Sequence, residues 1–459
     1  MRAAHPFVAL VGVLLLSISI ASAAGATGEG PSAAFALRRL SSDPFTNKGS
    51  QHHTEVEPDS FAFRSTIVTA FQMGRFDTGG SSDIGWARSV NAGKGWTSGI
   101  LPSLTRFYAG GAYDRASDPS VAYDVRHKTW IISSLGVVYP AGARNPKRMD
   151  VVTSRSVDNG GHWKAPVVVA SGMSLDKNWT ACDNRPSSPH YGNCYTEYDD
   201  PANHFAMGVG TSTDGGQTWT TVRVSTPVLG GQPLVQPNGT LIIPARNNAA
   251  AVGKIIAFRS RDGGATFGPP VVIATLHDHH VAGNLRSGES LPSAEIDESG
   301  KVYVAWADCL RAQCSANDIV ISTSTNGTKW TTPKRVPLDA PTSSVDHFIP
   351  GLAVDPTTRG STARLALTYY FYPVANCTAS TCRLDVGFVR SNNGGATWSK
   401  RVQLAGPMKL SWLPATTLGR MVGDYISTSF VNHVPKPVFA VAGAKNTNGT
   451  FNEAIYTTR

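Results

Sequence analysis

The chain has 459 residues, of which only 16% are charged, and its formal net charge is +9. The positive charge favours anionic partners. No run of Lys and Arg and no known binding motif accompanies it, however, which argues against nucleic acid as the partner. Gly, Ser and Thr are abundant and long stretches of helical periodicity are absent, so the composition predicts an all-β protein.

The first residues have the pattern of an export signal. Arg2 gives a basic start, an apolar run extends over residues 7–20, and small residues follow at 21–23. This pattern is typical of a secretory signal peptide. No later stretch approaches the roughly 20 apolar residues of a transmembrane helix. We therefore expect a signal peptide at 1–23, a linker at 24–34, and a secreted, extracellular protein without a membrane span.

Six cysteines fit an oxidising compartment because they occur in neighbouring pairs along the chain. The simplest pairing joins Cys182 with Cys194, Cys309 with Cys314, and Cys377 with Cys382. Such pairs predict disulfides that each close one local loop. No Cys-x-x-Cys spacing is present, which argues against a zinc site or thiol chemistry.

One eight-residue phrase, Ser-x-Asp-x-Gly-x-x-Trp, recurs along the chain. Complete copies stand at residues 156–163 and 212–219, and altered copies stand at 89–96, 260–267, 324–330 and 391–398. A carboxylate or amide two residues after Ser can bond the backbone of its own turn, and Gly supplies the positive φ that such a turn needs. Each copy therefore predicts a reinforced β-turn whose Trp packs back onto a sheet, and six copies predict radial repetition.

A second recurring phrase begins with polar or acidic residues and then turns apolar, as the start of a buried strand does. It begins at residues 57, 118, 176, 232, 289, 348 and 422. Each of the first six starts precedes two further strand-like segments and one copy of the turn phrase. The seventh lacks an outer strand, and residues 35–40 are the natural donor, which would leave no open edge. Because the repeat continues without a break in composition, we expect a single domain over 35–459.

The turn phrase resembles the Asp-box of the sialidase-like β-propellers, also called BNR-repeat proteins, and the resemblance covers nearly the whole mature chain. It implies a propeller of four-stranded antiparallel blades, with seven blades favoured by the seven strand starts. The six-bladed arrangement of the sialidases is the alternative. In that family the Asp-boxes lie on the face away from the active site, so these turns are expected to be structural. Inner-strand starts and second-to-third loops would form the functional face.

The same resemblance implies a secreted exo-glycosidase, a sialidase-like hydrolase that acts on terminal, acidic sugars without a metal or cofactor. Asp77 lies where the family carries its general acid, Glu289 starts a central inner strand as the family's Glu does, and Tyr425 resembles its nucleophilic Tyr. The early Phe-Arg-Ile-Pro motif is missing, so three carboxylate-binding arginines cannot be assigned uniquely. Four arginines are candidates for binding the substrate: Arg75, Arg246, Arg311 and Arg420.

Two other functions remain open at this point. Histidines at 52–53, at 277, 279 and 280, and at 347 fall on the expected functional face, where with Tyr425 and an arginine they could carry out β-elimination on a uronate-containing polysaccharide. A propeller can instead be a binding platform without catalysis. Trp179, Trp306 and Trp412 would then offer surfaces for sugar stacking. In each case the expected partner is a glycan and the protein is expected to be a monomer.

Overall fold

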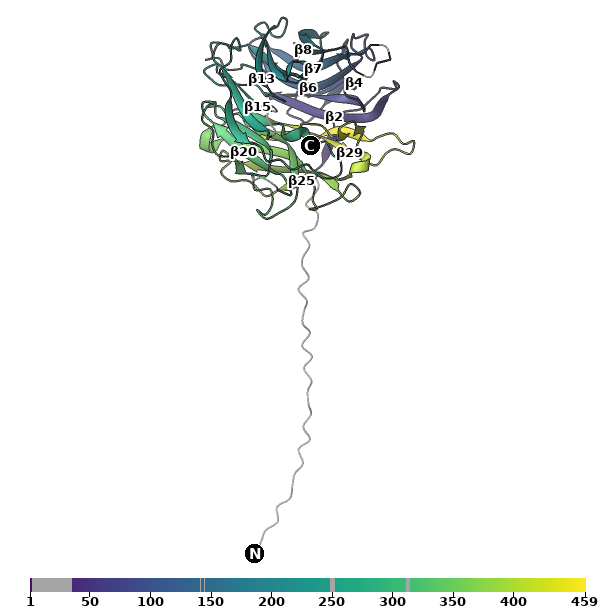
Figure 1. Cartoon of the computed structure of the whole chain (residues 1–459), viewed down its shortest axis with the longest axis vertical. Coiled ribbons are helices and arrows are strands. Elements are labelled where there is room, and N and C mark those ends of the chain that lie inside the picture. Colours follow the sequence, from purple (N-terminus) through teal and green to yellow (C-terminus); the bar gives the residue numbers. More distant parts are fainter. Residues whose placement is uncertain (2–34, 141, 144, 248–251, 311–313) are drawn as a thin grey trace. The chain divides into compact units, whose positions relative to one another are not determined.

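The computed structural model describes Met1 and residues 35–459, except residues 141, 144, 248–251 and 311–313 (Figure 1). The helical elements of this part of the chain are four 3-10 turns, namely η1 (Pro201–Asn203), η2 (Gly288–Ser290), η3 (Gly360–Thr362) and η4 (Leu410–Trp412). No described helix is long and apolar enough to span a bilayer. The expected signal peptide (1–23) and linker (24–34) lie outside the described residues.

Antiparallel strands follow one another in groups of four, which we number in chain order. Group 1 is β2 (Ser50–Phe63), β3 (Thr66–Phe76), β4 (Ser81–Ser89) and β5 (Thr97–Ile100). Group 2 is β6 (Arg115–Asp124), β7 (Thr129–Val138), β8 (Arg148–Ser156) and β9 (Val167–Gly172). Group 3 is β10 (Asp176–Cys182), β11 (Cys194–Asp200), β12 (Ala206–Ser212) and β13 (Thr220–Pro227). Group 4 is β14 (Leu234–Val235), β15 (Leu241–Asn247), β16 (Lys254–Ser260) and β17 (Val271–Thr275).

The second half of the chain continues the pattern. Group 5 is β18 (Ser293–Ile296), β19 (Val302–Asp308), β20 (Asp318–Ser324) and β21 (Lys334–Arg335). Group 6 is β22 (His347–Val354), β23 (Leu365–Phe371), β24 (Arg383–Ser391) and β25 (Val402–Lys409). A small hairpin, β26 (Ala415–Thr416) and β27 (Gly419–Arg420), precedes group 7, which is β28 (Ser427–Val431), β29 (Val434–Ala442), β30 (Glu453–Thr458) and β1 (Leu37–Arg39). One residue pair, Ser81 with Ala116, joins groups 1 and 2 into an eight-stranded sheet.

The first strands of these groups form a closed ring. β2 contacts β6, and the contacts then pass through β10, β14, β18, β22 and β28 back to β2. The C-terminal strands (yellow) therefore lie beside β2 (purple), as Figure 1 shows. A cavity of about 390 Å³ lies inside the ring and is lined by residues from all seven first strands of the described chain. The all-β propeller prediction is confirmed; these contacts fit seven blades, and the blade count stays our interpretation of them.

The two ends of the propeller close the ring together. β1 pairs antiparallel with β30, with Leu37 opposite Thr458 and Arg39 opposite Tyr456. The backbone N–H of Leu40 then donates to Ile455 O at 2.8 Å. The prediction that residues 35–40 supply the outer strand of the last group is therefore confirmed. An outer strand from the other end of the chain protects β30, which would otherwise be a free edge.

All six Asp-boxes form the predicted turn between the third and fourth strands of groups 1–6. In the copy of group 3, Ser212 Oγ donates to Asp214 Oδ1 at 2.9 Å and accepts from the N–H of Gly216 at 2.8 Å. The equivalent Ser–Gly bond is between 2.8 and 3.0 Å long in all six copies. The closing aromatic residue packs on an apolar cluster in each group, as Trp163 does at 7% exposure.

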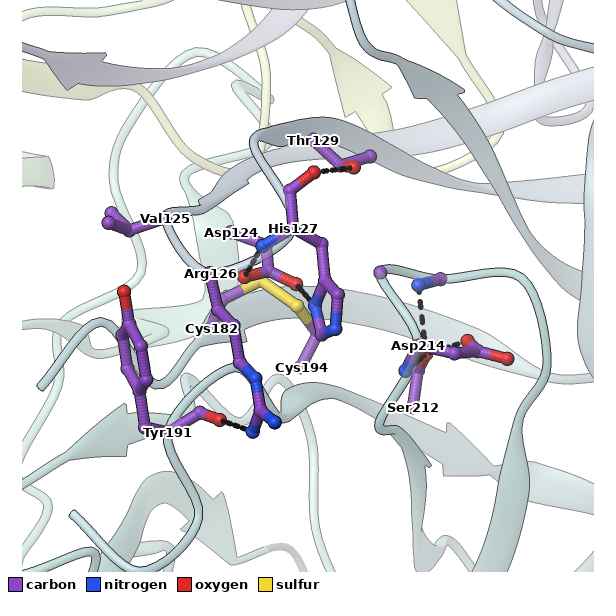
Figure 2. A network of polar contacts seen from close by, with 12 residues as sticks. Asp124, Val125, Arg126, His127, Thr129, Cys182, Tyr191, Cys194, Ser212 and Asp214 are labelled. Carbon is purple, nitrogen blue, oxygen red and sulfur yellow. Dashed lines mark hydrogen bonds and ion pairs between the residues drawn. A yellow bond between two sulfur atoms is a disulfide. The ribbon is translucent and has the colours of Figure 1, made fainter. Parts of the chain in front are cut away.

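Each Asp-box also contacts the group that precedes it around the ring. Figure 2 shows the box of group 3 beside the β6–β7 turn of group 2, where His127 Nδ1 lies 2.6 Å from Asp124 Oδ2. A Cβ on Gly215 would lie 2.9 Å from His127 Cβ, and φ is +73° there, so only glycine fits. The nearest atoms that a Cβ on a box glycine would meet come from group 7 for Gly93, group 1 for Gly160, group 2 for Gly216, group 3 for Gly264 and group 4 for Gly327. A Cβ on Gly394 would meet Gly360 of its own group first, and Tyr303 of group 5 at 3.7 Å.

Three disulfides are present, and all three join the neighbouring cysteines that the sequence paired. They are Cys182–Cys194, Cys309–Cys314 and Cys377–Cys382. The first joins the end of β10 to the start of β11 in group 3 (Figure 2). The other two close loops whose ends are five residues apart. Residues Ala34–Arg459 form one compact unit, and the domain boundaries at 24 and 35 stay predictions.

Candidate functional site

Bulges in the first strands turn polar side chains inward at one end of the ring. Register shifts interrupt β2, β6 and β10 just after Val56, Ser117 and Asp176. The residues at these shifts, Glu57, Asp118 and Lys177, have φ of +54°, +49° and +53°. Positive φ is uncommon outside glycine, and bulges often reorient side chains at functional sites. In β2, β6 and β10 the polar start that marked the inner strand in the sequence is therefore also its bulge.

Asp424 lies at the centre of the side chains that meet there. Arg286 Nε donates to its Oδ1 at 2.6 Å, and Arg286 Nη2 and Lys177 Nζ both contact its Oδ2. Burial alone would raise the pKa of Asp424, but Arg286 and Lys177 outweigh burial and hold that pKa well below its usual range. Asp424 is therefore a buried carboxylate that stays ionised, while Lys177 and Arg286 stay charged beside it.

Glu57 lies beside this ion pair, and its pKa is raised whereas that of Asp424 is lowered. Its Oε1 accepts from the N–H of Asp424 at 3.2 Å, and its Oε2 accepts from Gln72 Nε2. Gln72 Oε1 in turn accepts from Arg75 Nη1 at 2.9 Å. Burial, assisted by Asp118 and Asp424, raises the pKa of Glu57 to about 7. Two neighbouring carboxyl groups with pKa values pushed apart are the usual signature of acid–base assignments.

Tyr425 completes the group, which we call the axial cluster: Glu57, Arg75, Asp118, Asp176, Lys177, Arg286, Asp424 and Tyr425. The Tyr425 hydroxyl donates to Pro119 O at 2.9 Å, and its ring meets that of Trp179 edge-on at 5.0 Å. Burial, with Glu57 next, raises the pKa of Tyr425 well above its usual value. Tyr425 lines a small recess with Lys177 and Trp179, and Trp179 also lines the cavity inside the ring.

The predicted site residues divide between this cluster and its surroundings. Arg75 and Tyr425 lie in it. Glu289 lies in η2 with φ +48° and is exposed, and its backbone carbonyl accepts from Arg246. Arg246 Nη2 also lies 3.9 Å from Asp278 Oδ2. Arg420 is held by its backbone next to Arg286, and its Nη1 donates to Leu413 O at 2.7 Å.

Asp77 is exposed in a separate basin of about 410 Å³. The guanidinium of Arg115 lies in the same basin, 4.0 Å from the centroid of the Phe76 ring and 4.4 Å from that of Tyr139. Arg311 lies outside the described residues. The roles of Asp77, Glu289, Tyr425 and the four arginines therefore stay predictions.

The residues named for the alternative functions are dispersed. His52 Nδ1 lies 3.7 Å from Asp43 Oδ2, and His279 Nε2 lies 3.6 Å from Asp346 Oδ2. His347 is fully buried. Trp306 is also fully buried, with its Nε1 donating to Asp308 Oδ2 at 3.0 Å, so the expectation that it could stack on a sugar is wrong.

Sequence reasoning missed the lysine and the glutamine of the site. Lys177 was part of the phrase that marked the third strand start, but nothing in the phrase says that its side chain turns inward. Gln72 lies inside β3 without a distinguishing pattern. Arg286 was not among the four candidate arginines, and its bidentate contact with Asp424 spans 138 residues of sequence.

Residues 79–291 match the family described as the BNR repeat-like domain. This stretch is a BNR-repeat region. The matched region contains the Asp-boxes of groups 1–4, so the family expected from these turns is confirmed. No curated protein matches this BNR-repeat protein significantly.

Comparison with solved structures finds carbohydrate-active enzymes, of which the ulvan lyase supports the same fold. An ulvan lyase from a new polysaccharide lyase family is 11% identical, with 89% of this chain and 94% of that chain covered and a TM-score of 0.51. A Hadza microbial sialidase is 15% identical, with a TM-score of 0.45, and this chain covers 66% of its length while 89% of this chain is covered. A Penicillium chrysogenum alpha-L-arabinanase is 12% identical, with 92% and 97% covered and a TM-score of 0.46. At these identities the likeness is one of fold.

Proposed function

We propose that this BNR-repeat protein is a secreted glycoside hydrolase that cleaves terminal, acidic sugars at the axial cluster. The observation that carries the proposal is the pair of neighbouring carboxyl groups with opposite proton affinities, Glu57 and Asp424, beside Tyr425. A purely structural ion pair would need only Asp424 and Arg286. It would not need a second carboxyl group, that of Glu57, with a pKa of about 7. Perturbed pKa values cluster at functional sites because catalysis requires them.

In this proposal Tyr425 is the nucleophile and Glu57 is its general base. The raised pKa of Tyr425 means that its proton must leave as the bond to the anomeric carbon forms, and an adjacent carboxylate can accept it. A base whose pKa is near the working pH is more effective than an ordinary carboxylate. Glu57 thus takes the role predicted for Glu289, because the peptide N–H of Asp424, the residue before Tyr425, bonds its carboxylate.

Binding of an acidic sugar falls to the cations of the cluster, and protonation of the leaving oxygen falls to Asp77. Lys177 and Arg286 come from different segments and both contact Asp424, while Arg75 bonds Gln72, which bonds Glu57. A substrate carboxylate can compete for these cations. Asp77 is exposed, so it is free to approach a bound substrate. Arg246, Arg311 and Arg420 remain candidate contacts at the rim.

The test is a substrate panel of sialosides, arabinans and uronate-containing polysaccharides, with released reducing sugar as the readout. Tyr425→Phe and Glu57→Gln should each abolish release while the Tm and the circular dichroism spectrum stay near those of the wild type. Glu289→Gln is the matched control, since its carboxyl is exposed, and it should keep most activity. Full activity in Tyr425→Phe would refute the assignment.

A second candidate is a polysaccharide lyase. It is favoured by the ulvan lyase fold, which this chain covers over 94% of its length and whose structure holds a -[GlcA(1-4)Rha3S]- ligand. Arg75 and Lys177 would neutralise the uronate carboxylate, and Tyr425 or His279 would move the proton. This reaction leaves an unsaturated uronate that absorbs in the ultraviolet, whereas hydrolysis does not. Reducing sugar released together with that absorbance would select the lyase, and silence in both channels would favour a binding platform.

A further inference from the structure

A second cluster of ionisable side chains lies away from the axial cluster, where groups 5 and 6 meet. Asp318 begins β20, Asp339 follows β21, and His347 begins β22. One ligand atom of each of these three residues lies within 4.8 Å of those of the other two. No other group of three such residues with this spacing occurs in the described part of the chain.

An arginine fixes how the two carboxylates face the histidine. Arg335 Nε donates to Asp318 Oδ2 at 2.6 Å, and Arg335 Nη2 contacts Asp339 Oδ1. Each carboxylate therefore uses one oxygen on Arg335 and turns the other toward the imidazole. Asp318 Oδ1 lies 3.6 Å from His347 Nδ1, and Asp339 Oδ2 lies 3.6 Å from His347 Nε2. Hydrogen bonds that orient the carboxylates in this way are typical of the groups behind metal ligands.

The imidazole itself lacks partners. The side chain of His347 is 0% exposed, and its ring centroid lies 5.6 Å from that of Tyr369 and 6.0 Å from that of Phe371. Neither ring nitrogen has a hydrogen-bond partner among the described residues. Asp339 Oδ2 is also buried without one. Buried polar atoms are normally satisfied, so these three atoms call for a missing group.

We propose that Asp318, Asp339 and His347 bind a divalent transition metal ion of the zinc type. One imidazole nitrogen and two carboxylate oxygens are ligands that zinc accepts, and water would complete the coordination. Only one imidazole nitrogen can bind the ion. Ligand atoms about 2.1 Å from a tetrahedral ion lie roughly 3.4 Å apart, close to the 3.6 Å between His347 Nε2 and Asp339 Oδ2, and one ligand atom from each of the three residues lies within 4.8 Å of the others. The side chains of Asp318 and Asp339 are 28% and 16% exposed, which gives the ion an entry path.

The surroundings set the strength and the effect of binding. Arg335 neutralises one carboxylate charge, and Arg401, whose guanidinium lies 4.6 Å from the Phe371 ring, adds a second positive charge nearby. We therefore expect weaker binding than at a cysteine-rich zinc site. Since the three ligands come from the ends of β20, β21 and β22, the ion would tie group 5 to group 6. Its effect is stability, independent of the hydrolase proposal.

The experiment titrates untagged mature protein with Co²⁺, followed by visible absorbance, and with Zn²⁺, followed by Tm. One equivalent of Co²⁺ should give a ligand-field band, and Zn²⁺ should raise the Tm. In His347→Gln and Asp339→Asn, binding should weaken by about 10- to 100-fold or more. His279→Gln is the matched control: this histidine is 30% exposed and 3.6 Å from Asp346 Oδ2, and its loss should change neither signal.

Two results would overturn the proposal. One is a wild-type protein that shows neither the Co²⁺ band nor a Tm shift with Zn²⁺. The other is binding that persists in Asp339→Asn at wild-type strength, which would place the ion on other histidines. If His347→Gln does not fold, the wild-type titration and the Asp339→Asn variant still test the proposal. Asp339→Asn keeps the size of the side chain, so it should fold.

Discussion

Asp424→Asn is the substitution that tests the axial cluster most directly, because it removes one charge and almost no volume. The side chain of Asp424 is 4% exposed, and the cations that it contacts are also buried, with Lys177 at 8% and Arg286 at 16%. An asparagine can still accept from Arg286 Nε through its amide oxygen. Its NH₂ group cannot accept from Arg286 Nη2 or from Lys177 Nζ, so both cations lose the negative charge that they share, and Lys177 keeps only Asp118 Oδ2 at 3.8 Å.

Removing one partner of a buried ion pair costs about 3–5 kcal/mol, since the remaining charge stays buried without compensation. We expect a loss of this size in the free energy of unfolding at pH 7. Asp278→Asn is the matched control, because its carboxylate is 37% exposed and 3.9 Å from Arg246 Nη2. Its loss should cost less than about 1 kcal/mol.

The pH dependence gives a second test with a definite sign. The folded-state pKa of Asp424 is lowered, so the stability that it contributes is present above its unfolded pKa of about 3.9 and is lost as pH falls below that value. Urea unfolding at pH 7 and at pH 3 should therefore show a large difference between wild type and variant at pH 7 and a smaller one at pH 3. A loss under about 1 kcal/mol at pH 7, or a difference that does not shrink with pH, would refute the reasoning.

Four further predictions follow from the same contacts. Because the pKa of Glu57 is raised to about 7, the kcat/KM of the wild type should rise with pH through about 7 and then level off, and a pH profile without this step would contradict Glu57 as the base. Ser212→Ala should cost about 1–3 kcal/mol in urea unfolding, because it leaves the buried N–H of Gly216 without its acceptor, whereas the exposed neighbour Thr213→Ala should cost little. Replacing Cys182 and Cys194 together with alanine should cost about 3 kcal/mol for a loop of 12 residues, and an unchanged Tm would contradict it. Deleting residues 35–40 should expose the edge of β30 and cause aggregation, which size-exclusion chromatography would detect; a monodisperse product would argue against β1 as a protective strand.

The fold could be predicted because its signal is local and repeated. An Asp-box such as 212–219 contains its own hydrogen bonds, from Ser212 to Asp214 and to Gly216, so eight residues determine the turn wherever they occur. Ring closure through residues 35–40 followed from counting strands, since the last group would otherwise lack one. The disulfides followed from short spacing. None of these inferences needed the relative orientation of distant side chains.

The site could be predicted only in part, because it depends on bulges and on contacts across the ring. Tyr425 and Arg75 were found from motif resemblance, and both lie in the axial cluster. Glu289 was placed by its position before an inner strand, but its backbone adopts φ +48° and its side chain is exposed. Glu57 bonds the backbone of Asp424, 367 residues away. Nothing in the sequence of either segment indicates that these two residues meet.

The Asp-boxes give the propeller a direction as well as a repeat. Each box of groups 1–5 lies against the group before it, and the box of group 6 reaches group 5 through Tyr303, so six of the seven junctions have such a turn. Group 7 ends with the chain and has no box to place on group 6, and the described contacts at that junction are side-chain bonds such as Tyr370 Oη to Ala440 O at 2.8 Å. We therefore expect group 6 and group 7 to separate before any other pair of neighbouring groups. Amide hydrogen exchange should then be least protected along β28 and β25.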